Sequence, residues 1–484
     1  MRKMSILLKR YNSVSIVAKA TLWFVVCSIL QKGIAVITTP IFTRLMSPEQ
    51  YGQFSIYTSW LSIFTIITTL RLNGAVFNKG MSKFKDDRDT YTSTMQFVTL
   101  LMAVIAFCVY LIFHNQINKL TELPTFIMIA IFVELLVTPA IDFWTVRKRY
   151  EYEYKSVVFR TLLMAILNAG VGIVAVLLSD EKGYARILSC IIVNFFFGVV
   201  LFIYNMRRSR VLFKKEYAVF ALAFNLPLLL HYFSQYVLEQ SDRIMVQKMV
   251  GMAAVGIYSV SYNIALLMRI VTTSINNAIT PWQYECLEKK KYKRLDNTMF
   301  LIFVLVAGCS FLLSCFAPEI MKILANEKYY EGIYVIPPVA MGLFFSFMYT
   351  TFANVEFYFD KNKFSMYISC AGAILNVLLN YVGIRYFGYL AAAYTTLICY
   401  AFFAIGHYIY MIRSVKISIG SADIFNAKRL VLLSLGEIIF GSAIIIFYNM
   451  IIIRYMIVLA IVLAVYLNRE RIINVLKTVK NEEV

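Results

Sequence analysis

Four basic side chains lie deep inside long apolar segments of this sequence, where they could bind an anion. Lys32 and Arg269 fall near the middle of apolar runs of about 30 residues, and Arg71 and Arg160 lie nearer the ends of theirs. A charged side chain at the centre of a bilayer costs at least about 2.5–3.5 kcal/mol, so those retained there usually face a cavity or an opposite charge. These four residues therefore predict a binding site for an anionic substrate.

Acidic side chains and one histidine occupy similar depths and could carry a coupling ion. Burial can bring the pKa of a carboxyl group toward the working pH, and histidine titrates near neutrality without such help. We expect ion coupling at Glu134, Glu239, Asp242 and His231. Structural alternatives stay open: the acids and Glu437 could neutralise the buried cations, Asp242 and Arg243 could form either a rim salt bridge or a gating contact, and the histidine could be a hydrogen-bonded core residue.

The motifs of most enzymes and ATP-driven pumps are missing from the sequence. It has no Gly-rich phosphate loop ending in Lys-Ser or Lys-Thr, no His-Glu-x-x-His zinc motif, no nucleophile elbow and no ion-selectivity filter. Its 8 Cys stand singly in or beside apolar runs, which is typical of small core residues. We expect no catalytic activity, no cofactor and no metal site, so the energy must come from an ion gradient or the substrate gradient.

The composition is that of a membrane protein. Of the 484 residues, 60% are hydrophobic and 15% charged, against roughly 45–50% and about 25% in soluble domains. Apolar stretches longer than about 18 residues recur along the chain, which is the pattern of membrane-spanning helices rather than of barrel strands. We expect an all-α integral membrane protein with about 14 transmembrane helices. The expected spans are 14–43, 51–78, 91–114, 123–146, 155–178, 184–206, 217–247, 253–284, 297–317, 333–358, 364–386, 388–411, 429–448 and 450–468.

The distribution of the +20 formal charge indicates how the helices are oriented. Lys and Arg favour the two ends and the even-numbered loops by roughly four to one, and positive residues are retained in the cytoplasm. This predicts an even number of helices, both termini cytoplasmic, and a first helix that is kept rather than cleaved as a signal peptide. The basic runs at 207–208, 214–215 and 289–291 then act as topology signals, so we expect no nucleic-acid partner.

Short internal matches predict that the chain is duplicated. Each pair of matching segments is separated by about 204–208 residues, and duplicated halves are common in secondary transporters. The pairs are 44–46 with 248–250, 52–55 with 256–259, 165–168 with 373–376, and 183–184 with 388–389. Helices one to six then correspond to seven to twelve, giving two parallel six-helix lobes with pseudo-twofold symmetry and two C-terminal helices. The expected divisions are 1–211, 212–418 and 419–484.

This duplication places the four candidate cations relative to one another. Lys32 in helix one and Arg269 in helix eight could face each other across the pseudo-twofold interface, where transporters bind their substrates. Arg71 and Arg160 lie nearer the cytoplasmic side, although Arg160 could also reach the headgroups. Together they would line a cationic vestibule that opens inward.

One further acid closes a helix at the inner face in each half. Asp142 in helix four and Glu356 in helix ten are each followed by two aromatic residues. We interpret both segments as part of an aromatic interface belt, with a rim on the substrate side as the alternative.

Two segments carry a resemblance to a known family. Thr39–Gly52, which reads TPIFTRLMSPEQYG, closely resembles the first-loop signature of the polysaccharide-transport branch of the multidrug/oligosaccharidyl-lipid/polysaccharide exporter superfamily. Asp242–Met245 followed by Val255–Tyr258 is similar to the segment joining helices seven and eight in that family. The related lipid II flippases carry several Arg in helix one, whereas Lys32 is the one deep basic residue of that helix here, which favours the repeat-unit branch.

The resemblance implies a flippase for O-antigen or capsule repeat units. Such a protein moves an undecaprenyl-pyrophosphate-linked oligosaccharide from the inner to the outer leaflet of the bacterial cytoplasmic membrane by alternating access. In that family two six-helix lobes enclose a cationic cavity, and helices thirteen and fourteen help to form a groove for the lipid tail. The implied partners are the lipid-linked glycan and membrane lipid, with a polysaccharide polymerase or ligase as a further candidate.

Two other functions are weighed against the flippase. A multidrug extruder of the same superfamily, working by cation antiport, should have an acidic cavity, yet the deep cations Lys32, Arg71 and Arg269 outweigh Glu134. A membrane glycan ligase or polymerase would act on the same lipid-linked substrates, but the longest external loop, about 318–332, has neither Arg nor His. Both functions therefore rank below the flippase.

Overall fold

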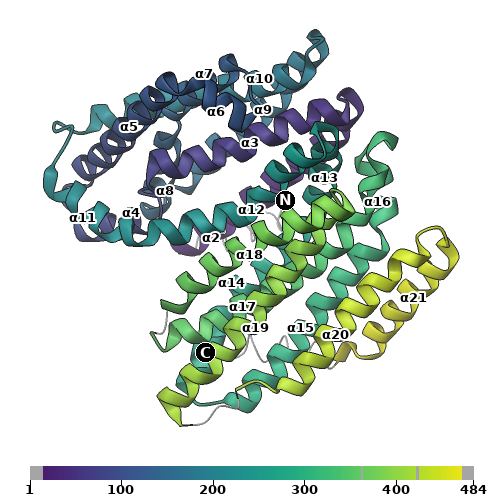
Figure 1. Ribbon diagram of the computed structural model, residues 1–484. Helices are drawn as coiled ribbons and strands as arrows, with labels where there is room; N and C mark the ends of the chain where they lie inside the picture. The colour runs from purple at the N-terminus through teal and green to yellow at the C-terminus, as the bar shows by residue number, and fades with distance from the viewer. Residues whose placement is uncertain (1–14, 361–362, 421–423, 471–484) are drawn as a thin grey trace, which may run out of the picture. The chain divides into compact units, whose positions relative to one another are not determined.

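The protein is built from helices throughout its described length. The computed structural model describes residues 15–360, 363–420 and 424–470, and these residues form helices and their connections without a strand (Figure 1). They belong to two compact units, Met1–Phe233 and Ser234–Val484, whose boundary falls within helix α12 (Leu229–Met249). The divisions expected at 211 and 418 stay predictions.

Each unit is a bundle of long helices joined by short connections. The first unit contains α2 (Ile16–Leu45), α3 (Pro48–Thr69), α4 (Ala75–Lys83), α5 (Arg88–Ile112), α6 (His114–Thr121), α7 (Thr125–Leu135), α8 (Pro139–Tyr150), α9 (Tyr154–Leu178), α10 (Lys182–Arg208), α11 (Lys215–Asn225) and the start of α12. The second contains the rest of α12, α13 (Met252–Ala265), α14 (Leu267–Glu288), α15 (Tyr292–Cys315), α16 (Ala317–Leu324), α17 (Ile336–Tyr358), α18 (Lys363–Phe387), α19 (Ala391–Ile419), α20 (Ala427–Ala443) and α21 (Ile451–Leu467). Short 3₁₀ turns occupy Leu226–Leu228, Glu327–Val335 and Ile444–Phe447.

The helices have the length and composition of membrane spans. Among the described residues, 12 helical segments are long and apolar enough to cross a membrane. The predicted all-α membrane fold is therefore confirmed. The count of fourteen stays a prediction, because α3 is not among the 12 and α21 qualifies only as a shorter apolar helix.

The span expected at 51–78 is not one continuous helix. It divides into α3 and α4, because Leu70 and Arg71 take left-handed φ angles of 47° and 55°. The hydroxyl of Thr69 accepts a hydrogen bond of 3.2 Å from the backbone N–H of Arg71 and so stabilises the turn. The expectation of a continuous helix was wrong because hydropathy measures apolar length and not the dihedral angles of single residues.

A second interruption lies beside another candidate cation. The span expected at 253–284 divides at Leu266 into α13 and α14, and the backbone N–H of Arg269 donates to the carbonyl of Leu266 at 2.9 Å. The spans expected at 123–146 and 217–247 are interrupted as well, at 136–138 and Leu226–Leu228. Arg71 therefore lies in the turn between α3 and α4, and Arg269 lies in the first turn of α14.

The first-loop signature covers the end of α2 and the start of α3. The hydroxyl of Ser47 accepts a hydrogen bond of 3.3 Å from the N–H of Gln50, and the Gln50 side-chain oxygen accepts one of 3.0 Å from the N–H of Ser47. This reciprocal pair is a capping box, followed by Pro48 at the first helical position. The motif thus fixes where the second long helix begins.

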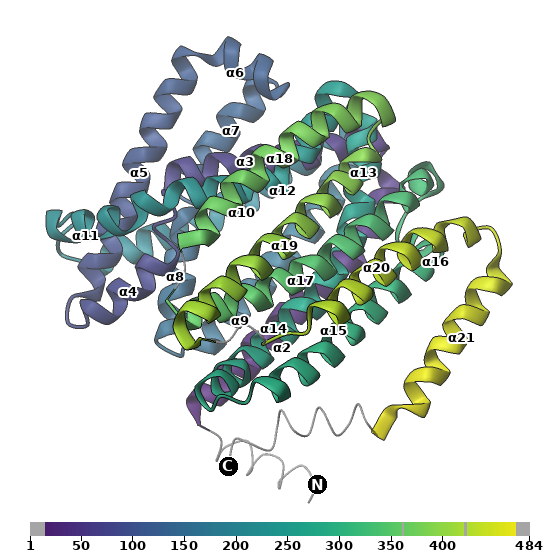
Figure 2. The same cartoon turned by 60° about the horizontal axis from the view of Figure 1, so that its bottom comes forward.

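The interior of the second unit is organised around α17. This helix packs against α13, α14, α15, α19 and α20 (Figure 2). Most of its residues are buried. By contrast, α2 in the first unit buries few side chains and presents apolar residues such as Ile29 and Ile37 outward. An exposed apolar helix of this length suits contact with lipid chains.

Candidate functional site

A polar pocket in the second unit contains two of the predicted residues. Arg269 on α14 donates a hydrogen bond of 3.1 Å from Nη1 to Oε1 of Glu239 on α12, and both side chains are partly exposed. The pocket has a volume of about 230 Å³. Its wall also includes the polar side chains of Gln235, Thr272, Thr273, Asn276, Ser346 and Thr350. The structure therefore brings a cation, an acid and several neutral hydrogen-bonding groups to one cavity.

Two tyrosines complete this pocket and were not predicted. Tyr349 on α17 and Tyr400 on α19 line it, with ring centroids 6.3 Å apart and planes inclined by 9°. A cavity with an ion pair, hydroxyls and aromatic faces can bind a ligand that carries both negative charge and sugar hydroxyls. The sequence has 33 Tyr and 38 Phe, so composition could not single out these two.

The first unit gathers cations around Asp142. The carboxylate of Asp142 accepts a hydrogen bond of 2.7 Å from Asn73 and interacts electrostatically with Arg160, Arg71 and Arg149. The structure thus brings together Arg71 and Arg160, the two residues predicted to line a vestibule. It also adds Arg149, which sequence reasoning did not select.

Aromatic rings hold two of these guanidinium groups. Arg160 lies over the ring of Trp144 at 5.4 Å and donates a hydrogen bond to the hydroxyl of Thr145. Arg71 lies over the ring of Tyr232 at 5.6 Å. Contacts of this kind keep a cation in place without neutralising its charge.

Lys32 is exposed on α2. The described residues place it in the first unit and Arg269 in the second. Their facing one another across the two halves stays a prediction.

Glu134 is buried and held by neutral donors. On α7, it is 1% exposed, and its two oxygens accept hydrogen bonds from the hydroxyl of Tyr57 at 2.9 Å and the amide of Asn194 at 2.8 Å. The structural alternative for Glu134 was a pairing with a basic residue. In the described part of the chain, its oxygens are bound by these neutral donors instead. A buried carboxyl group without a fixed counter-ion can exchange a proton as its surroundings change.

Asp242 is also buried, in a hydrogen-bonded cluster of the second unit. Its oxygens accept bonds from Tyr258 at 2.8 Å, Asn380 at 2.7 Å and Thr396 at 2.8 Å, which tie α12 to α13, α18 and α19. Its neighbour Arg243 instead donates to the hydroxyl of Ser259 at 3.2 Å. This acid therefore lies where the packing of four helices depends on its contacts.

Two further acidic or titratable candidates lie in the second half of the chain and at its boundary, His231 on α12 and Glu437 on α20. His231 is partly buried on α12, and its Nδ1 has no hydrogen-bond partner among the described residues. Glu437 is buried on α20. In the described ranges, no group of three or more His, Cys, Asp or Glu residues could hold a metal ion.

Glu356 does not lie at a surface rim. It is fully buried, and its Oε1 lies 2.9 Å from Nδ1 of His407 on α19. The interface-belt interpretation is therefore corrected for this residue, because helix packing turns it toward α19. No sequence signal connects the two residues, which are 51 positions apart.

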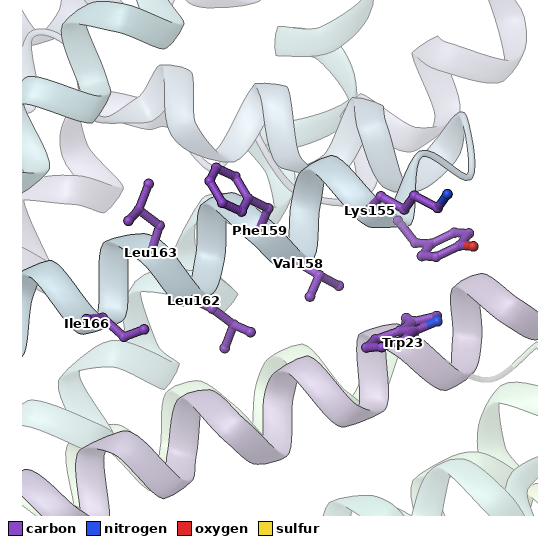
Figure 3. Close-up of a pocket in the computed structure, with 8 residues that line it drawn as sticks. Trp23, Lys155, Val158, Phe159, Leu162, Leu163 and Ile166 are labelled. Atoms are coloured by element: carbon purple, nitrogen blue, oxygen red, sulfur yellow. The ribbon is translucent and has the colours of Figure 1, made fainter.

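An apolar groove runs between α2 and α9 in the first unit. It has a volume of about 450 Å³ and is lined by side chains of α9 and by Trp23 of α2. Figure 3 shows Lys155 and Trp23 at one end of this groove and Ile166 at the other. Because both helices have the length and hydropathy of membrane spans, the groove suits a lipid chain with a polar group near Lys155.

Comparison with known proteins assigns the family. The family model described as polysaccharide biosynthesis protein matches residues 17–286, which is more than half of the chain. The chain belongs to this family. A second model, MatE, matches residues 227–382.

Curated relatives align with most of this chain. Lsg locus protein 1 of Haemophilus influenzae is 23% identical over 384 residues, with 77% of this chain and 94% of the relative aligned. An uncharacterized membrane protein of Methanocaldococcus jannaschii is 22% identical, with 78% and 94% aligned. These relatives agree with a multi-pass integral membrane protein.

Solved structures show the same fold. The lipid II flippase MurJ in an inward closed conformation aligns with a TM-score of 0.65 at 11% identity, covering 93% of this chain and all of that chain. An inward-facing multidrug resistance MATE family transporter of the MOP superfamily aligns with a TM-score of 0.58 at 13% identity, covering 80% and 95%. Family and fold together confirm the polysaccharide-transport family of the multidrug/oligosaccharidyl-lipid/polysaccharide exporter superfamily, whose structural neighbours here are a flippase and a transporter rather than enzymes.

Proposed function

We propose that this protein is a flippase for undecaprenyl-pyrophosphate-linked oligosaccharides. It moves O-antigen or capsule repeat units from the inner to the outer leaflet of the bacterial cytoplasmic membrane, with both termini in the cytoplasm. The observation that carries the proposal is Arg269 in a tyrosine-lined polar pocket of a membrane lobe. Membership of the polysaccharide biosynthesis family supports it.

The chemistry of the substrate matches the residues available. A pyrophosphate binds guanidinium and ammonium groups through charge-assisted hydrogen bonds, and Arg can form two at once. We assign this role to Lys32, Arg71, Arg160 and Arg269. The glycan then contacts hydroxyls and aromatic faces such as Tyr400, while the polyprenyl tail stays in the lipid.

The counter-ions explain how the cations can be both stable and available. Glu239 binds Arg269 at 3.1 Å and Asp142 lies among three arginines of the first unit, so each cationic site contains an opposite charge before the substrate arrives. A pyrophosphate with more negative charge than one carboxylate competes for the same donors. The acids thereby favour release as well as selectivity.

Alternating access is the mechanism that suits two six-helix halves. In such transporters the halves rock about a site between them, so that the cavity opens first to one side and then to the other. The translocated repeat unit would then meet a polysaccharide polymerase or ligase on the outer side.

Ion coupling is the second part of the proposal. Glu134 and Asp242 are buried acids whose oxygens accept hydrogen bonds from neutral donors, and Glu239 and His231 complete the set of candidate carriers. Proton binding at such a group changes the charge inside the lobe and can therefore bias its packing. Transport that persists unchanged after the proton gradient is collapsed would contradict this part.

Drug extrusion by cation antiport is the alternative. The MatE model match and the fold of the multidrug transporter favour it, whereas the cations of the two sites oppose it, since an organic cation requires an acidic cavity.

The deciding measurement is the leaflet distribution of the polyprenyl-pyrophosphate glycan in cells. We expect inner-leaflet accumulation when the protein is deleted, and the same result for the double variant Lys32→Ala plus Arg269→Ala at normal protein levels. Arg385→Ala is the matched control, because Arg385 is an exposed cation on α18 outside both sites. An unchanged distribution after deletion, with no second flippase present, would favour drug efflux.

A further inference from the structure

A buried pair of titratable side chains joins the two helices α17 and α19. Glu356 is 0% exposed and His407 is 3% exposed, and Oε1 of the former lies 2.9 Å from Nδ1 of the latter. The second carboxylate oxygen, Oε2, is buried and has no hydrogen-bond partner among the described residues. Any charge or proton on this pair is therefore shielded from water, and in the described part of the chain Oε2 is an acceptor without a donor.

Aromatic side chains lie beside this pair on α17 and α19. Among the described residues, His407 supplies the electrostatic interactions of the Glu356 carboxylate. Two tyrosines contact aromatic rings in this part of α17: Tyr408 of α19 contacts Phe352, and Tyr284 of α14 contacts Tyr358. Charged side chains elsewhere on the packed helices, such as Arg413 of α19 and Glu437 of α20, are not among the groups that act on Glu356 in the described part of the chain. From α15, Phe303 contributes an apolar ring to Phe352. In the described part of the chain, no cation other than the histidine acts on this carboxylate.

One tyrosine connects the pair with the polar pocket. Tyr349 lines the pocket that contains Glu239 and Arg269, and its ring stacks on His407 with centroids 5.5 Å apart and planes inclined by 22°. A change in the charge or position of the imidazole therefore acts directly on a side chain of the pocket wall.

We propose that Glu356 and His407 form a proton-binding site that communicates with the polar pocket through Tyr349. The ligand is a single proton. Without it, the carboxylate is ionised beside a neutral imidazole. With it, the carboxyl group is neutral: the added proton is carried by Oε2, and Oε1 keeps its hydrogen bond to Nδ1 of the neutral imidazole. Since an isolated buried carboxylate is costly and a neutralised one is not, protonation changes how tightly α17 and α19 can pack.

The two halves of the chain differ in this respect. In the first unit Asp142 lies in the first turn of α8, within the span predicted to correspond to α17. It accepts a hydrogen bond from Asn73 and interacts with three arginines. In the second unit Glu356 faces a histidine, which is the side chain whose charge changes near neutral pH. Of the two acids, only Glu356 therefore has a histidine partner and forms the proposed proton-binding site.

Infrared difference spectroscopy of the purified full-length protein tests proton binding directly. Spectra are recorded in lipid nanodiscs between about pH 5 and 8, the range in which histidine-linked groups titrate. We expect one component of the carboxylic-acid C=O band to grow on acidification, to be missing in Glu356→Gln and to move along the pH axis in His407→Asn. Glu437→Gln is the matched control, because Glu437 is also buried but lies on α20, and this variant should keep the band. Spectra of Glu356→Gln that match the wild type at every pH would overturn the site.

The link to the pocket rests on the proposed function and has its own readout. In proteoliposomes with a lipid-linked glycan, the initial rate of the wild type should change with pH by up to about tenfold per pH unit. In Glu356→Gln this dependence should flatten while the protein remains folded, and in Tyr349→Leu the infrared titration should persist although the pH dependence of transport is lost. An unaltered pH profile in Glu356→Gln would overturn the link. Absence of translocation by the wild type at every pH would instead contradict the proposed function and leave the infrared result standing.

Discussion

Arg269 and Glu239 form an ion pair of 3.1 Å between α14 and α12, inside the polar pocket of the second unit. The pair is partly exposed, so water and ligands reach both charges. Any anion that binds Arg269 must therefore compete with Glu239. The strength of that competition can be measured from either side of the pair.

Removing the cation should weaken pyrophosphate binding, and removing the acid should strengthen it. Hydrogen bonds to charged groups contribute about 1.5–3 kcal/mol, so Arg269→Ala should lower the affinity for undecaprenyl pyrophosphate roughly 10- to 100-fold. Glu239→Gln frees Arg269 and should raise the affinity. Isothermal titration calorimetry on the purified protein measures both, with Arg385→Ala as the control. Equal affinities for all three variants and the wild type would place the pyrophosphate elsewhere.

The aromatic wall of the pocket should act on the sugar and not on the phosphate. We expect Tyr400→Leu to reduce the affinity for the glycan-bearing lipid while the affinity for undecaprenyl pyrophosphate stays within about twofold, because stacking contributes only where a sugar ring is present. Calorimetry with the two ligands provides the comparison within one variant. A parallel loss for both ligands would show that Tyr400 acts by shaping the pocket.

The buried Glu134 should depend on its tyrosine partner. Tyr57→Phe leaves one carboxylate oxygen without its donor, and an unsatisfied buried polar group costs about 1–3 kcal/mol. The thermal unfolding midpoint in detergent should fall accordingly, and the effect should shrink when Glu134→Gln is already present. Tyr91→Phe is the control, since the hydroxyl of Tyr91 donates to the carbonyl of Val76 at 3.0 Å and should show no coupling with residue 134.

Acid should loosen the C-terminal helix α21. Arg454 donates hydrogen bonds of 2.7 Å to both carboxylate oxygens of Glu319 and another of 2.7 Å to the carbonyl of Cys315. Partial burial opposes ionisation, but the bonds from Arg454 outweigh it and hold the pKa of Glu319 below its ordinary value of 4.5. A carboxyl group with a lowered folded pKa stabilises the fold above pH 4.5, and this contribution is lost as the pH falls through the folded value.

Labelling of Cys315 measures this loosening. Cys315 is 1% exposed while Arg454 binds Glu319. In a variant that retains only this cysteine, its labelling by a thiol reagent active in acid should rise as the pH falls below about 4.5. Glu319→Gln should raise the labelling at neutral pH and remove its pH dependence. Glu327→Gln, which alters an exposed acid nearby, should behave as the wild type. If neither the pH nor Glu319→Gln changes the labelling, the Arg454–Glu319 ion pair does not hold α21 in place.

The first-loop signature should act through helix capping. Ser47→Ala removes one half of the capping box of α3 and should destabilise the protein by about 0.5–2 kcal/mol. Thermal unfolding measures the loss. Ser28→Ala removes a hydroxyl that bonds to the carbonyl of Phe24 within α2, and it should cost less than about 0.5 kcal/mol. Similar costs for the two variants would mean that the motif is retained for another reason.

The amino-acid sequence was enough to predict an all-α membrane protein and to identify its unusual charges. Both follow from local properties: an apolar run long enough to cross a bilayer must satisfy its backbone hydrogen bonds as a helix, and Lys32 or Glu134 within such a run is costly wherever the helix packs. The family signature is equally local, because Ser47 and Gln50 cap α3 within one turn.

The tertiary structure alone decided which charges meet. Arg269 pairs with Glu239, 30 residues away, and Glu356 with His407, 51 residues away, through the packing of separate helices. Hydropathy specifies neither the rotation of a helix about its axis nor the left-handed turn at Arg71, so it could place Glu356 near a helix end but not inside the lobe. Contacts between distant residues depend on how whole helix faces fit together, and that information exists only once the chain has folded.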